Sequence, residues 1–170
     1  MFQDEARFGR INDVRRCWAP LPMRPLCRAM LTHEYTYAYG AVDVVGGELD
    51  CLILAHVNMH CMQIFLDEVG NRHPQCRIIM VLDGAGWHVG GALKPPPNMK
   101  LPSLPPYAPE LNPVEHIWDE LREKFFHNKA FDSIDAPEDQ LQIGLLALEN
   151  DQPRVHSIVA WGWIVNALWN

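Results

Sequence analysis

Residues 104–118, LPPYAPELNPVEHIW, are rich in proline and then begin a helical pattern. Because proline lacks an N–H and has a fixed φ, the first part of this stretch can form neither an interior helix nor a central strand. We expect a stiff, mostly extended connector that sets where the next helix starts. Asn112 suits the N-cap of that helix, Pro113 its first position, and Glu115 its first turn. Two interpretations of Glu115 stay open: a capping box, in which it only bonds back to the backbone, or a side chain that must reach a fixed point.

The helix predicted from Pro113 has one apolar side. This stripe consists of Val114, Ile117, Trp118, Leu121 and Phe125. Glu115 flanks it, about 100° from its middle. The glutamate is therefore expected at the rim of a sheet on which the helix packs.

The strands are predicted from alternation and from β-branched and aromatic content. Residues 2–8 alternate, with Asp4 on the apolar face and Glu5 on the polar one. Residues 35–45 and 49–55 form a hairpin that turns at Gly46–Gly47. Residues 77–83, RIIMVLD, are apolar up to Asp83, which is typical of a strand buried on both faces in a parallel sheet.

Two further helices complete a mixed α/β pattern. The first follows the hairpin and closes at Gly70–Asn71, and the second covers 137–149. The predicted buried face of the first helix consists of Met59, Met62, Phe65, Leu66 and Val69. A Trp-rich tail ends the chain and is expected to pack on something.

Composition limits the function classes. The 170 residues suffice for one domain, and a net charge of −7 counts against a freestanding DNA-binding domain. The charge is uneven, because residues 1–28 carry +3 and the remainder −10. The five cysteines form no C-x-x-C pair, and there is neither a signal peptide nor an apolar run that spans a bilayer. We expect a cytoplasmic protein with reduced thiols and no membrane association.

Three carboxylates are candidates for catalysis. Asp4 faces the core, where a carboxylate needs a partner or a metal, unless it points to water from a frayed chain end. Asp83 ends a buried strand, where sites form in open α/β sheets, although a turn aspartate is the alternative. If Asp4, Asp83 and Glu115 converge, Mg²⁺ or Mn²⁺ would relieve their repulsion, and two such ions can clamp a phosphoryl transfer.

Three segments carry a family resemblance. FQDEARFG (2–9), VLDGAGWH (81–88) and LPPYAPELNPVEHIWDELREKFFHN (104–128) resemble the catalytic domain of DDE transposases, in the bacterial insertion-sequence branch related to mariner-type elements. The resemblance implies a ribonuclease H-like α/β fold, a mixed five-stranded sheet with helices on both faces. It implies that residues 1–132 form the catalytic domain and that 133–170 are a helical extension packed on it.

The resemblance also implies the chemistry. Asp4, Asp83 and Glu115 would be the catalytic and metal-binding residues, with two Mg²⁺ or Mn²⁺ ions as cofactor. A metal-dependent endonuclease and strand transferase of this kind frees a 3′-hydroxyl at the transposon end and then joins it to target DNA. The expected function is DNA transposition, with recombination and integration of a mobile insertion sequence.

Partners follow from the same resemblance. We expect double-stranded DNA, both transposon ends and target, and association with the nucleoid when the protein is active. Because the chain begins almost at the first catalytic strand, a helix-turn-helix domain is expected to be absent. We expect a homodimer, or a partner that supplies the helix-turn-helix domain. Arg7, Arg10 and His88 are candidate DNA contacts, with a solvated surface and a structural histidine as alternatives.

Other readings remain open. The chain could be a catalytically inactive, truncated transposase remnant that acts by dimerisation or inhibition, with the Trp-rich tail as its contact surface. It could also be a ribonuclease H-like nuclease that acts on an RNA-containing substrate. His56, His60 and Cys61 lack a second cluster that would complete a zinc site, so ordinary packing is the expectation for them.

Overall fold

An antiparallel three-stranded sheet forms the centre of the molecule. The computed structural model describes residues 1–10, 18–23, 34–83, 93–106, 108–127, 129, 131 and 133–168. Strands β1 (Phe2–Gly9), β2 (Tyr35–Val42) and β3 (Leu49–Leu54) lie in the order β1-β2-β3. The predicted hairpin is confirmed, and strand β2 ends where the Asp43 carboxylate accepts the N–H groups of Val45 and Gly46.

A second, parallel sheet lies beside the first. It pairs β4 (Ile78–Ile79) with β5 (Met99–Lys100), and isolated parallel bridges join Phe2 to Val81 and Leu82 to Ser103. The expectation of one five-stranded sheet is therefore wrong, because the strands form two separate sheets, one of three strands and one of two. Pro102 shortens the β4–β5 ladder, because Met80 N–H donates to Lys100 O but the return bond to Met80 would need an N–H on residue 102. The link from this sheet to β1 is the isolated bridge between Phe2 and Val81.

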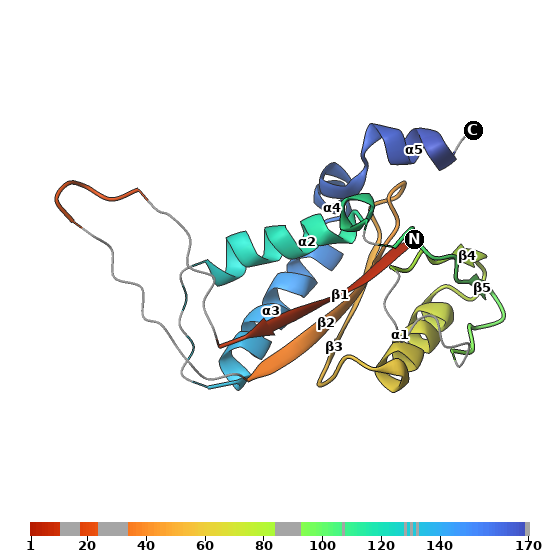
Figure 1. Cartoon of the computed structure of the whole chain (residues 1–170), viewed down its shortest axis with the longest axis horizontal. Coiled ribbons are helices and arrows are strands. Elements are labelled where there is room, and N and C mark those ends of the chain that lie inside the picture. Colours follow the sequence, from red (N-terminus) through yellow and green to blue (C-terminus); the bar gives the residue numbers. More distant parts are fainter. Residues whose placement is uncertain are drawn as a thin grey trace.

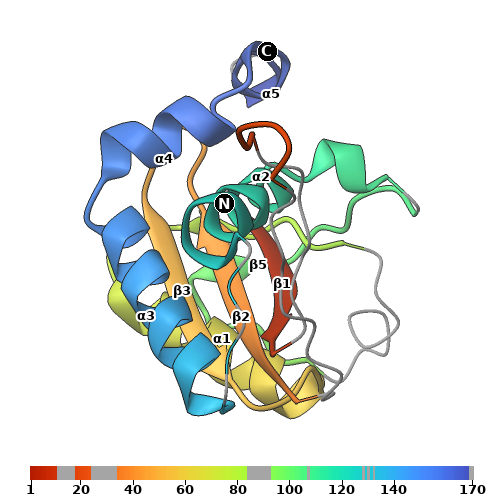
Figure 2. The same cartoon turned by 90° about the vertical axis from the view of Figure 1, so that its left-hand side faces the viewer.

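Helices cover both faces of the central sheet, as predicted (Figures 1 and 2). Helix α1 (Met59–Arg72) packs on one face, and its Phe65 meets Tyr39 of β2. Helices α2 (Val114–Leu121), α3 (Asp135–Glu149) and α4 (Gln152–Val159) lie on the other face. The buried side chains of this second layer include Trp118, Leu121, Leu141, Leu148, Val155 and Val159.

Several local expectations are corrected. Residues 77–83 are not buried on both faces, since Ile79 is 60% exposed while its neighbours Ile78 and Met80 are buried. Helix α1 continues past Gly70–Asn71 to Arg72, whose guanidinium bonds Glu68 and Asp50. Met59, in the first turn of α1, is exposed rather than part of the buried face.

The helix that carries Glu115 changes pitch at its end. A π-helical turn, η2 (Arg122–Phe126), follows α2 directly. The wider turn places Phe126, five residues after Leu121, in the core, and leaves Phe125 only half-buried. The predicted stripe is otherwise confirmed, because Val114, Ile117, Trp118 and Leu121 are all fully buried.

The C-terminal region packs on the same core as the sheet. Leu141, Leu145 and Leu148 of α3 belong to one cluster with Ala6 and Phe8 of β1. A short helix α5 (Gly162–Leu168) follows α4, with Trp161 packed edge-on against His116 and Trp163 half exposed. The boundary between a domain 1–132 and an extension 133–170 stays a prediction. Within the described ranges, no helix is long and apolar enough to cross a membrane.

Candidate active site

Asp4 lies within β1 and is buried. Its side chain is 7% exposed, and its backbone pairs with Gly40 of β2, so the interpretation as a frayed chain end is wrong. The Trp118 indole N–H donates a 2.8 Å hydrogen bond to Asp4 Oδ2. On its other side, β1 is held by Gln3 N–H, which donates to Val81 O at 2.9 Å. Asp4 is therefore fixed by bonds on both sides of its strand.

Asn112 fixes the start of α2 to the same strand. Its Nδ2 donates to Gln3 O at 3.0 Å, and its Oδ1 accepts from Val114 N–H at 3.2 Å. The backbone N–H of Asn112 donates to Pro109 O, which closes a 3₁₀ turn, η1 (Pro109–Leu111), inside the connector that was expected to be extended. Because that N–H is already engaged, a capping box with Glu115 is not the arrangement at this helix start.

Asp4 lies close enough to Glu115 and Asp83 to be repelled by both. Burial, and after it the charge of Glu115, raises the pKa of Asp4 to about 8. The Trp118 hydrogen bond lowers the Asp4 pKa, while Glu5 and Asp83 add weaker repulsion. The fold thus brings residues from β1, from the end of the 77–83 segment and from the first turn of α2 into one electrostatic environment.

Asp83 comes directly after Leu82, which pairs in parallel with Ser103. Leu82 N–H donates to Pro102 O, and Leu104 N–H donates to Leu82 O, so the chain is held in place up to the residue before Asp83. Asp83 is half-buried. His88, the candidate DNA contact that follows it, lies outside the described residues.

The donor set fits a hard divalent cation. Carboxylate oxygens are the ligands that Mg²⁺ and Mn²⁺ prefer, and a cation would relieve the repulsion that raises the Asp4 pKa. Among the described residues, no three His, Cys, Asp or Glu side chains are already arranged as a metal site. The assignment of Asp4, Asp83 and Glu115 as ligands therefore stays a prediction.

The two candidate arginines differ in their surroundings. The Arg10 guanidinium binds Glu34 Oε2 at 2.8 Å and the Phe131 carbonyl at 3.2 Å, and its side chain is 14% exposed. Arg7 is exposed and lies over the Tyr35 ring at 4.3 Å. Of this pair, Arg7 presents the more accessible cation to a phosphate.

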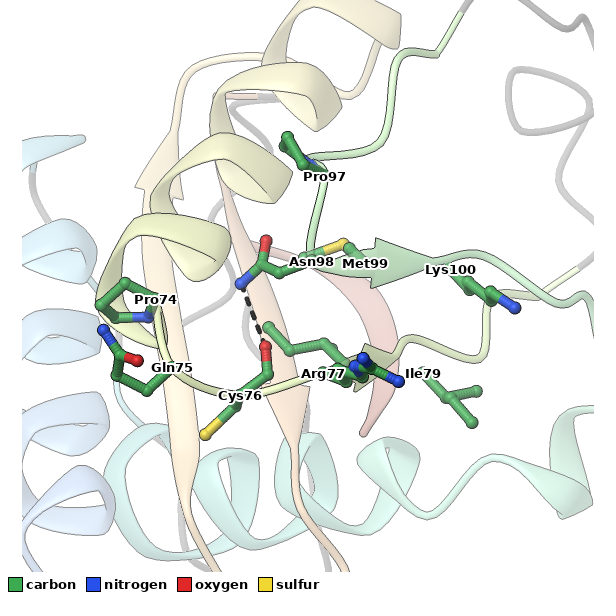
Figure 3. Close-up of a pocket in the computed structure, with 10 residues that line it drawn as sticks. Pro74, Gln75, Cys76, Arg77, Ile79, Pro97, Asn98, Met99 and Lys100 are labelled. Atoms are coloured by element: carbon green, nitrogen blue, oxygen red, sulfur yellow. Dashed lines mark hydrogen bonds between the residues drawn. The ribbon is translucent and has the colours of Figure 1, made fainter.

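A hollow of about 710 Å³ lies at the β4–β5 edge (Figure 3). Its lining includes Arg77, Ile79, Asn98 and Lys100, but none of the three carboxylates. Asn98 Nδ2 donates to the carbonyls of Gly70, His73 and Cys76, so this side chain ties β5 to the end of α1. The hollow is therefore separate from the carboxylate site.

Sequence reasoning missed the partners of Asp4. Trp118 was placed only in the apolar stripe, and Asn112 only as a cap. Both also bond to β1, beside or at Asp4. The signal was present in the N-P-x-E-x-x-W spacing, which places both residues within one turn of Glu115.

Comparison with known proteins identifies the family of the chain. A family model described as DDE superfamily endonuclease matches residues 1–136. The uncharacterized protein y4pE/y4sA of Sinorhizobium fredii (strain NBRC 101917 / NGR234) is 38% identical over 102 residues, which are 59% of this chain and 76% of that protein.

Solved structures share the fold. The Mos1 mariner paired-end complex with Mn has a TM-score of 0.62 at 16% identity, covering 92% of this chain and 52% of that one. The paired-end complex with Mg has a TM-score of 0.61 at 17% identity, covering 94% of this chain and 55% of that one. The Mos1 strand transfer complex has a TM-score of 0.58 at 16% identity, covering 94% of this chain and 54% of that one. The chain spans about half the length of these Mos1 chains, and its mixed α/β structure resembles their ribonuclease H-like fold. From the family match over most of its length, the chain belongs to the DDE superfamily endonuclease family.

Proposed function

We propose that this chain is the catalytic domain of a transposase that cleaves transposon-end DNA and joins it to target DNA. The observation that carries the proposal is the burial of Asp4 next to Glu115 and Asp83, which raises its pKa to about 8. A buried carboxylate with acidic neighbours lowers stability, so its presence supports a function that needs it. The family match supports the same chemistry.

Asp4, Asp83 and Glu115 would hold Mg²⁺ or Mn²⁺, as two ions. When bound, the cations supply activation of the attacking oxygen and neutralisation of charge on the phosphate. The chain's own contribution is rigid placement. Asp4 comes from a strand paired on both sides, and Glu115 from a helix whose start is tied to that strand by Asn112. Complexes of Mos1 are described with Mn and with Mg, which supports this choice of metal.

The DNA substrate is proposed from charge and from the relatives. The Mos1 structures are complexes with transposon ends. With a net charge of −7, the present chain would obtain most of its DNA affinity from the cations and from another domain or subunit. We therefore propose a homodimer, or a partner that supplies a helix-turn-helix domain, with Arg7 as an additional phosphate contact.

A second candidate function is that of an inactive remnant that binds to an intact transposase. Trp163, which is 51% exposed beside the partly buried Trp161, favours it because this tail offers an aromatic contact surface. The two candidates differ in whether the chain binds metal and cuts DNA.

The test is a nicking assay with the full chain on a plasmid that carries the DNA flanking its reading frame. We expect cleavage in Mg²⁺ or Mn²⁺, with or without a supplied helix-turn-helix partner, and none in EDTA. Asp83→Asn and Glu115→Gln should abolish it, whereas Asp139→Asn, a matched change of an exposed aspartate on α3, should not. Wild-type cutting by Asp83→Asn would contradict the assignment, and preferential cutting of an RNA–DNA hybrid would redirect the substrate class.

A further inference from the structure

We propose that Trp118 is a positioning residue for the metal-binding carboxylate of Asp4. Its indole N–H holds Oδ2, and this leaves Oδ1 as the oxygen that Asp4 offers to a divalent cation. The inference rests on the proposed function, because it assigns Trp118 a role at the same site. It gives the last residue of the N-P-x-E-x-x-W block a task beyond filling the core.

The bond itself has only one possible direction. An indole nitrogen is a donor and never an acceptor, so the 2.8 Å contact is Trp118 donating to the carboxylate. Trp118 is fully buried and Asp4 nearly so, and water therefore does not compete for either group. Hydrogen bonds from a neutral donor to a buried carboxylate are among the stronger ones in proteins.

The indole ring is held in place by its surroundings. Gly40, which pairs with Asp4 across β1 and β2, leaves the space that the ring occupies: a Cβ there would lie 2.7 Å from Trp118 Cη2. Phe8, on the same face of β1 as Asp4, meets the ring edge-on, with centroids 6.2 Å apart and planes at 73°. The N–H cannot turn away from Asp4 without repacking this layer.

The same helix carries Glu115 and orients Asp4. Trp118 follows Glu115 by three residues, so both lie on adjacent parts of one helix side. Asn112, three residues before Glu115, bonds Gln3 O, next to Asp4 in the strand. One bond from Asn112, just before α2, and one from Trp118 within it thus reach the consecutive residues Gln3 and Asp4 of β1. The separation of the Glu115 and Asp4 carboxylates therefore depends on how α2 packs on the strand. Partners that orient metal ligands in this way typically change metal affinity about 10–100-fold when they are removed.

The direct test compares Mn²⁺ binding by the full chain, measured by electron paramagnetic resonance, in the wild type and two matched variants. Trp118→Phe keeps most of the ring but removes the N–H. Trp161→Phe removes an indole N–H that donates to Ile158 O rather than to a carboxylate. We expect Trp118→Phe to weaken Mn²⁺ binding about 10-fold or more, with Trp161→Phe unchanged and with metal-free melting temperatures that show both variants folded.

The outcomes separate this inference from the function on which it rests. Wild-type Mn²⁺ affinity in Trp118→Phe, together with lost binding in Asp4→Asn, would overturn the role of Trp118 and leave the metal site standing. Absence of Mn²⁺ binding by the wild type would overturn the proposed metal site and this inference with it.

A second measurement uses the unaltered protein and applies even if Trp118→Phe fails to fold. The indole ¹H–¹⁵N resonance of Trp118, assigned through its contacts with Gly40, should shift when Mg²⁺ is added, and that of Trp161 should not. An unmoved Trp118 resonance at saturating Mg²⁺ would contradict the inference.

Discussion

The burial of Asp4 gives a pH-dependent prediction for the metal-free protein. Its pKa rises from 3.8 to about 8 on folding, chiefly because burial disfavours the charged form and next because Glu115 repels it. The folded protein therefore holds this proton more tightly than the unfolded chain. The destabilisation is absent below pH 3.8, grows as the pH rises, and is complete above about pH 8.

The magnitude follows from the pKa. Each pH unit between the two pKa values removes about 1.4 kcal/mol from the free energy of unfolding. Between pH 5 and pH 8 this amounts to about 4 kcal/mol, a large part of the total stability of an ordinary domain. Asp4→Asn has no such titration, and its amide oxygen can still accept the Trp118 N–H. We expect the stability of Asp4→Asn minus that of the wild type to increase by about that amount over this pH range.

The assay is urea unfolding in EDTA, followed by tryptophan fluorescence at several pH values from 5 to 8. Asp139→Asn serves as the control, because it removes an exposed carboxylate and should run parallel to the wild type. Adding Mg²⁺ at pH 8 should restore stability to the wild type but not to Asp4→Asn. A stability difference between Asp4→Asn and the wild type that stays constant from pH 5 to 8 would refute the reasoning.

Four further substitutions test the packing at the site and the buried ion pair at the end of α1. Gly40→Ala places a methyl group 2.7 Å from the Trp118 ring, and this overpacking should cost about 1–3 kcal/mol in urea unfolding. The N-cap of α2 is Pro113 rather than the expected Asn112, but Asn112→Ala still loses the bond to β1 and the bond from Val114 N–H. The free energy of unfolding should therefore fall by about 1–2 kcal/mol in the same assay. Asp50→Ala leaves the guanidinium and imidazole that it binds at the end of α1 without their buried partner, at a cost of about 2 kcal/mol. Loss of the exposed ion pair in Glu68→Ala should change thermal stability by less than about 0.5 kcal/mol. Equal losses of stability in Asp50→Ala and Glu68→Ala would contradict the expectation that the buried ion pair matters more than the exposed one.

Much of the fold could be predicted from local patterns. Alternation located the strand that carries Asp4, and the Gly46–Gly47 signal located the hairpin. The apolar stripe of α2 was also correct at Val114 through Leu121, because a helix side repeats with a period that is visible in the sequence. The family assignment came from short motifs and is confirmed by the match over residues 1–136.

Other features were not predictable because they depend on pairing between distant segments. The β4–β5 ladder is interrupted where Pro102 lies opposite Met80, a conflict that shows only once the partner strand is known. Ile79 is exposed because nothing in the described structure covers that side of β4, although its sequence neighbourhood is uniformly apolar. The π-helical turn after Leu121, which places Phe126 in the core, likewise has no local signal in the sequence.

The amino-acid sequence by itself determined which segments become strands and helices, and which three acidic residues are candidates for catalysis. Only the tertiary structure decided what surrounds Asp4: the indole of Trp118, which is 114 positions away, and the charge of Glu115. The physical reason is that burial, hydrogen bonding and repulsion act over a few ångströms in space, and chain separation carries no information about such distances.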